Sequence, residues 1–167
     1  MIVPPTIFAD AESGPEVTIR VDGRGSFQNS PALKDFTQKM IEGGRRDFII
    51  DLRNCPAMDS TFMGTLAAIA FRLRAAGGGK LWVVNRNERN ADLLAGLGID
   101  TLFSDEPLPV PVNGSKGGAI EYQAGKSETR QVMHEAHEAC VAANPANAGK
   151  FKDVLEHLVA SAARAAS

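Results

Sequence analysis

The sequence lacks a hydrophobic run long enough for a membrane helix, has only two cysteines and carries almost no excess of charge. Its apolar stretches fall well short of the ~20 residues that span a bilayer, and residues 1–6 lack the basic and apolar regions of a signal peptide. Cys55 and Cys140 lie far apart without CxxC spacing, which favours free thiols in a reducing compartment. A net charge of −2 argues against a nucleic-acid-binding surface. We therefore expect a cytoplasmic protein without a nucleic-acid or membrane partner.

Apolar segments of strand length alternate with helical patterns over the first two thirds of the chain. Residues 17–21 alternate between apolar and polar side chains, as a strand with one buried face does. Residues 48–52 and 81–84 are nearly continuous apolar runs, which are typical of strands covered on both faces. Helical patterns separate these three segments, and two successive strand–helix–strand units predict parallel pairing. The sequence therefore predicts an α/β fold with a sheet of about four to five strands and helices packed on it.

The chain divides by composition into three parts. We expect the α/β domain over residues 14–105, after a loose lead-in, with its last strand near residues 99–103. Residues 106–126 are rich in Pro, Gly, Ser and Asn, which is typical of a linker or long loop. Residues 127–167 hold two amphipathic helical patterns, at about 128–143 and 148–164, that predict a C-terminal helical hairpin. Such a hairpin is too small to be stable alone, so its apolar stripe must pack on the α/β domain, a second copy or a partner.

The motifs that resemble enzyme and metal sites are incomplete in this sequence. Residues 77–80 read Gly-Gly-Gly-Lys, but they follow a helix and precede a strand, the reverse of a phosphate-binding loop, and are better explained as a turn. His134 and His137 flank Glu135 with HExH spacing, and Cys140 follows, but this spacing misses the two-imidazole geometry of a zinc helix. Paired carboxylates and a nucleophile–base set cannot be placed either. We therefore expect no catalytic residue, no metal and no cofactor.

The triplet Asp59-Ser60-Thr61 stands where an apolar strand and a short loop give way to a helix. Backbone N–H groups and the helix dipole favour an anion at such a corner. A phosphate on Ser60 would add a charge of roughly −1.5 to −2, which suggests a switch more than a catalyst. The alternative is that Asp59 and Ser60 simply start the helix, because both residue types are favoured N-caps.

The order of these elements resembles a STAS domain of the anti-sigma factor antagonist type. The resembling residues are the run 48–52, Met58-Asp59-Ser60-Thr61 with Gly64 and Leu66, the segment 80–84 after helix-end glycines, and residues 93–99. The resemblance implies that Ser60 is phosphorylated by a partner anti-sigma factor that is itself a serine kinase, and that Asp59 flanks and orients it. It also implies a serine phosphatase that resets the switch in a bacterial signalling pathway. The family's Asp-Ser-Ser/Thr-Gly-Leu pattern departs here, because Phe62 replaces its first glycine while Gly64 matches the second.

Two functions follow as hypotheses, neither of them enzymatic. In the first, the unphosphorylated chain binds and sequesters the anti-sigma factor through Asp59, Ser60, Thr61, Phe62, Met63 and Gly64, with Thr61 as a second possible phosphoacceptor. In the second, the chain is a structural or assembly module with a constitutive partner that is indifferent to Ser60. The C-terminal helices could then also form a homodimer.

Overall fold

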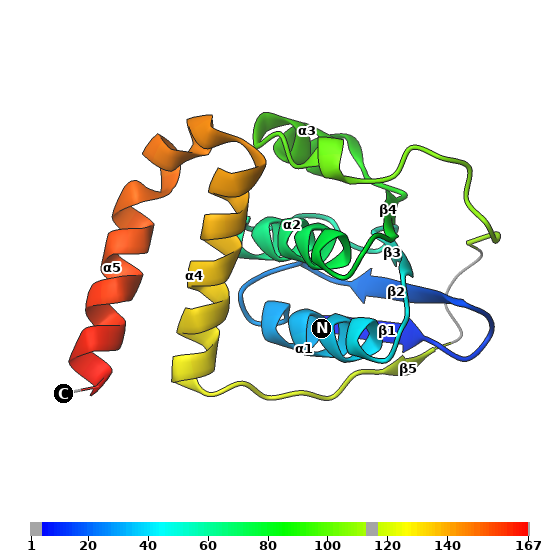
Figure 1. Ribbon diagram of the computed structural model, residues 1–167, viewed down its shortest axis with the longest axis horizontal. Coiled ribbons are helices and arrows are strands. Elements are labelled where there is room, and N and C mark those ends of the chain that lie inside the picture. Colours follow the sequence, from blue (N-terminus) through cyan, green and yellow to red (C-terminus); the bar gives the residue numbers. More distant parts are fainter. Residues whose placement is uncertain (1–4, 113–116, 167) are drawn as a thin grey trace.

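A computed structural model of the protein describes residues 5–112 and 117–166. Within these residues the chain forms a five-stranded sheet and five α-helices (Figure 1). In chain order the elements are β1 (Thr6–Asp10), β2 (Glu16–Asp22), α1 (Ser30–Glu42), β3 (Asp47–Asp51), α2 (Ser60–Ala75), β4 (Lys80–Val84), α3 (Glu88–Gly96), the 3-10 turn η1 (Asp100–Leu102), β5 (Gly118–Ala119), α4 (Lys126–Ala143), the 3-10 turn η2 (Pro145–Asn147) and α5 (Ala148–Ala166).

The sheet has the strand order β4-β3-β2-β1-β5. β2, β3 and β4 pair in parallel, with Ile19 opposite Ile50 and Ile50 opposite Val83. The helices α1 and α2 connect these strands, which confirms the predicted α/β fold and its parallel pairing. The apolar runs made this arrangement predictable, because central parallel strands need apolar side chains on both faces.

Both strands at the β1 side of the sheet differ from the expectation. Residues 6–10, expected to be part of a loose lead-in, form β1, which pairs antiparallel with β2. Residues 118 and 119 form the short strand β5 on the outer edge of β1, inside the segment expected to be a linker. The strand expected near residues 99–103 is absent, since residues 100–102 form the 3-10 turn η1. The sheet is therefore completed by segments with weak sequence signals.

The helices form successive layers on one side of the sheet (Figure 1). α1 and α2 lie next to the strands, α4 packs against α2 and α1, and α5 packs against the outer side of α4. α2 is therefore enclosed between the sheet and α4, and eleven of its sixteen residues are buried. A helix that is apolar nearly all round needs such cover on both sides.

The turn after α2 confirms that Gly77–Gly79 end a helix. All three glycines have positive φ, at 101°, 123° and 152°. A Cβ on Gly79 would also lie 2.5 Å from the carbonyl oxygen of Arg46, so the chain has room only for glycine there.

Among the described residues, no helix is both long and apolar enough to cross a membrane.

Candidate functional site

Ser60 is the first residue of α2, at the corner that the sequence predicts. The residue before it, Asp59, is the N-cap: its Oδ1 accepts a hydrogen bond of 2.9 Å from the backbone N–H of Phe62. The other oxygen, Oδ2, accepts one of 2.9 Å from the N–H of Phe27, in the loop before α1. The carboxylate therefore starts the helix and also ties the corner to the neighbouring loop, which holds Ser60 in a defined position.

The hydroxyl of Ser60 is hydrogen-bonded to a histidine from the far end of the chain. Its Oγ lies 2.9 Å from Nε2 of His137 in α4, and Nδ1 of the same ring lies 2.6 Å from the carbonyl oxygen of Met133. Since a carbonyl only accepts, Nδ1 carries the proton in the neutral ring and Nε2 accepts from the Ser60 hydroxyl. Burial lowers the pKa of His137 below its usual value, which favours this neutral form.

α4 approaches α2 very closely beside this serine. A Cβ on Gly64 would lie only 2.1 Å from the carbonyl oxygen of Ala136, so the two helix backbones meet where α2 has no side chain. The Sγ of Cys140 lies 4.0 Å from the carbonyl oxygen of Ser60, and burial raises the pKa of this thiol to about 12. From α5, the ring of Phe151 packs edge-on against His137, with centroids 4.9 Å apart. As a result, Ser60 is half-buried and His137 is buried.

An ion-pair cluster holds the same two helices together further along. Glu135 of α4 pairs with Lys34 of α1 at 2.6 Å and with Arg72 of α2. Burial lowers the pKa of both basic groups, and the nearby Arg72 charge lowers that of Lys34 further. One carboxylate therefore faces two partly desolvated cations, and both cations belong to the α/β part of the chain.

The six residues expected to bind a partner do not share one surface. Asp59 and Ser60 are half-buried, whereas Thr61, Phe62 and Met63 are buried. The ring of Phe62 faces the core, because a Cβ on Gly25 would come within 2.6 Å of it. The ring of Phe62 therefore occupies space that is free because Gly25 has no side chain.

Sequence reasoning missed the residues of α4 that meet the Ser60 corner. His134, His137 and Cys140 were weighed as a metal site, and the predicted amphipathic helix left open what its apolar stripe packs on, whereas His137, Ala139 and Cys140 are buried. The small residues Gly64 and Ala68 of α2, one turn apart, were the available signal for a closely packed second helix. Among the residues that the structure describes, no group of three or more His, Cys, Asp or Glu side chains could hold a metal ion.

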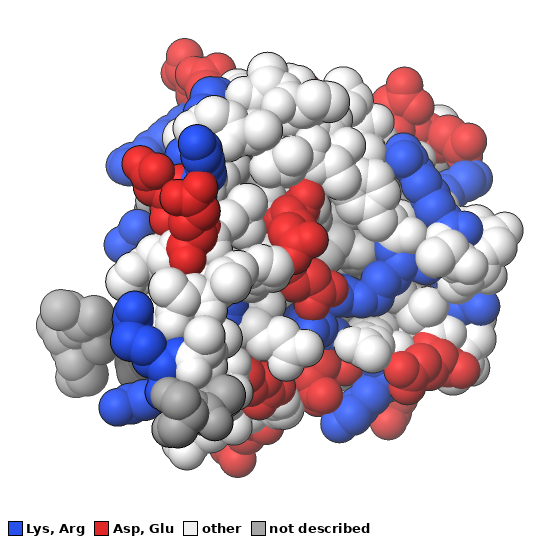
Figure 2. Space-filling view, turned by 60° about the vertical axis from the view of Figure 1, so that its left-hand side comes forward, with Lys and Arg blue, Asp and Glu red and all other residues white. Residues whose placement is uncertain are grey.

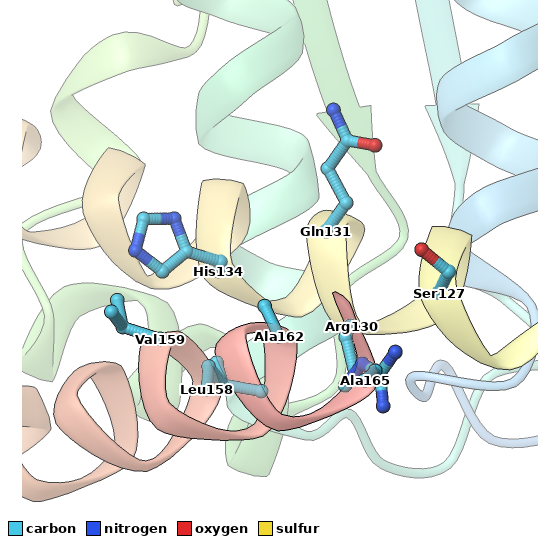
Figure 3. A pocket seen from close by; sticks show the side chains of 8 residues that line it. All are labelled: Ser127, Arg130, Gln131, His134, Leu158, Val159, Ala162 and Ala165. Carbon is cyan, nitrogen blue, oxygen red and sulfur yellow. The ribbon is translucent and has the colours of Figure 1, made fainter. Parts of the chain in front are cut away.

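A cavity of about 530 Å³ lies between α4 and α5, away from this corner (Figure 3). Its lining is largely apolar, with Leu158 and Val159 from α5, and Arg130 and His134 from α4 stand beside it. Nδ1 of His134 lies 2.5 Å from a carboxylate oxygen of Glu138, one turn further along α4. None of the lining residues belongs to α2, so this cavity is separate from the Ser60 corner.

Comparisons with known proteins agree on the fold of the first two thirds of the chain. The sequence model of the STAS domain matches residues 9–110. A crystal structure of a candidate anti-sigma factor antagonist from Thermotoga maritima is similar, with 17% identity, a TM-score of 0.52, and coverage of 57% of this chain and 82% of that chain. An NMR structure of the same protein gives 16% identity and a TM-score of 0.51, covering 62% and 78% of the two chains. No match was found among curated proteins.

Proposed function

This chain belongs to the STAS domain family, and on that premise we propose that it is a protein-binding regulator of the anti-sigma factor antagonist kind. In this proposal the unphosphorylated chain sequesters an anti-sigma factor that is also a serine kinase. The kinase phosphorylates Ser60, a serine phosphatase removes the phosphate, and the exchange takes place in the cytoplasm. The similar Thermotoga maritima structure, itself a candidate antagonist, supports this role.

The observation that carries the proposal is the position of Ser60 as first residue of α2, directly after its capping aspartate. A phosphate there would lie at the positive end of the helix dipole, which favours its negative charge. The same phosphate would bring a charge of roughly −1.5 to −2 next to the Asp59 carboxylate and into the contact surface. Repulsion and desolvation then oppose docking of the partner, which gives phosphorylation its switching effect.

The test compares Ser60→Ala and Ser60→Glu as baits in native lysate, with captured proteins identified by mass spectrometry. We expect the alanine form to retain a serine kinase that the glutamate form loses. Ser127 offers matched control variants, because it also lies in the first turn of a helix but is exposed. Ser127→Ala and Ser127→Glu should capture the same proteins as each other. Equal capture by the two Ser60 variants would contradict the switch.

The second candidate function is assembly through the C-terminal helices. It is favoured by two exposed valines of α5, Val154 and Val159, the second of which stands beside the cavity between α4 and α5. Figure 2 shows broad uncharged areas between charged groups on this side of the molecule. A homodimer through α5 would be seen by light scattering as a doubled mass that Val159→Glu abolishes, and a monomeric wild-type chain would contradict it.

A further inference from the structure

α4 lies outside the STAS-matched residues 9–110, yet it packs along α2 beside Ser60 (Figure 1). The Ser60 hydroxyl bonds to its His137, and its Ala136 lies over Gly64. The residues proposed to receive a partner are therefore already in contact with a helix of the same chain.

The covered face of α2 is shaped for a helix. Gly64 allows a backbone approach that any side chain would block, and Thr65 and Ala68 continue the same face with small side chains. Lys34 and Arg72 stand at its end, and a single carboxylate from the covering helix forms an ion pair with each of them. A helix that fits this face therefore carries a carboxylate immediately followed by a small residue, as Glu135 and Ala136 do.

The contact of α4 has the composition of an exchangeable interface. Its buried residues are Val132, Ala136, His137, Ala139 and Cys140, of which only Val132 is a branched aliphatic side chain. Small side chains bury little apolar area, and the polar contacts across the interface can be replaced by equivalent ones from another helix. α4 is also tethered, because β5 ends at Ala119 and α4 begins at Lys126. Such a short connection keeps its local concentration high even when the contact itself is weak.

We propose that α4 occupies the partner-binding face of α2 in cis, and that the partner binds by replacing it with a helix bearing a carboxylate next to a small residue. This inference rests on the proposed function, because it assumes that the Ser60 corner is where a partner docks. Sequestration then requires α4 to leave, and the C-terminal hairpin competes with the partner for one surface.

Displacement of α4 can be measured with the two native thiols of the full chain. Cys140 lies on α4 against α2, and Cys55 is buried in the α/β part, so Cys55 reports whether that part stays folded. In Ala136→Phe we expect alkylation of Cys140 to rise roughly ten-fold or more, as an overpacked contact shifts the docking equilibrium, while Cys55 stays protected. Ala142→Phe is the matched control, since Ala142 is exposed on the same helix, and should leave both rates unchanged.

A second variant, Glu135→Lys, replaces the two ion pairs with Lys34 and Arg72 by repulsion between like charges, with little change in side-chain volume. It should likewise raise alkylation of Cys140 and leave Cys55 protected. If Cys140 stays protected in both variants, or if Cys55 becomes reactive together with Cys140, α4 is an integral part of the core and the proposal is wrong. A wild-type chain of doubled mass by light scattering that Val159→Glu does not abolish, with Cys140 protected, would assign the face to α4 of a second copy and would equally overturn it.

The exposed face is then offered a labelled synthetic peptide of residues 126–143. We expect the peptide to bind Ala136→Phe, to bind wild type at least ten-fold more weakly because α4 competes, and to lose binding when Gly64→Ala is added to Ala136→Phe. Failure to bind Ala136→Phe would refute the helix-binding face. The assay involves neither Ser60 phosphorylation nor the cellular partner, so peptide binding together with equal capture by the Ser60 baits would reject only the switch.

Discussion

Gly64→Ala separates the stability of α2 from the docking of α4, because the two effects have opposite signs. Alanine is favoured over glycine inside a helix by up to about 1 kcal/mol, so α2 alone should gain stability. Against this, the new Cβ would lie 2.1 Å from the carbonyl oxygen of Ala136. A carbon–oxygen contact needs about 3.3 Å, so α4 must move by roughly 1 Å.

The clash should outweigh the gain in helix propensity. The contact is with the backbone of α4, so rotation of a side chain cannot relieve it, and such overpacking costs about 1–3 kcal/mol. Loss of the Ser60–His137 hydrogen bond would add about 1 kcal/mol. We expect docking to weaken by about 2–4 kcal/mol, which is roughly a thirty-fold change or more in its equilibrium constant, while the helix-propensity gain offsets part of this loss in the stability of the whole chain.

The assay combines thermal unfolding with alkylation of Cys140. Gly96→Ala in α3 is the matched control, because a Cβ there meets nothing within 4 Å. We expect Gly64→Ala to increase alkylation of Cys140 and lower the unfolding temperature, while Gly96→Ala changes neither by much. A Gly64→Ala chain as stable as wild type with Cys140 still protected would refute the close contact between the helices.

Three further predictions concern single groups. Burial lowers the pKa of His137, so the docked state binds fewer protons than the undocked one. The contribution of His137 to stability is therefore complete above the ordinary pKa of about 6.5 and is lost as the pH falls below it. The unfolding temperature should drop more between pH 7.5 and 5.0 in wild type than in His137→Gln, and equal drops would contradict this. Asp59→Ala removes two acceptors of backbone N–H groups and should cost about 1–2 kcal/mol in urea unfolding, with Asp59→Asn less affected; no loss would show that water replaces the cap. Gly79→Ala should lower the unfolding temperature more than Gly78→Ala, because only the first places a Cβ against the backbone of Arg46. Similar losses would mean that positive φ alone sets the cost.

The central part of the fold was predictable because its signals are local. Residues 48–52 and 81–84 are apolar enough to require cover on both faces, and the intervening helical pattern gives their parallel pairing. β1 and β5 lack such signals, since residues 6–10 form a strand of mostly half-buried residues and the edge strand β5 is only two residues long. β1 forms because β2 offers it a partner, and β5 forms because β1 does, which is information from the tertiary structure.

Only the part of the candidate site that lies at the start of α2 could be predicted from the sequence. Asp59 and Ser60 could be placed at the start of a helix from residue type and position alone. The contact of Ser60 with His137 joins residues 77 positions apart, and the sequence does not state which face of α4 turns toward α2. The side chain of Phe62, one of the residues expected to bind a partner, lies instead in the core beside Gly25.

The short connection between β5 and α4 also has a kinetic consequence. Any enzyme or reagent that must displace His137 to reach the Ser60 hydroxyl works only on the fraction of molecules in which α4 has left. Each 1.4 kcal/mol of docking free energy lowers that fraction about ten-fold and slows modification by the same factor. Because α4 remains tethered after it has left α2, it returns quickly. The fraction of molecules with α4 undocked therefore stays at equilibrium during modification. Substitutions on α4 would thus tune how fast Ser60 reacts without altering the serine itself.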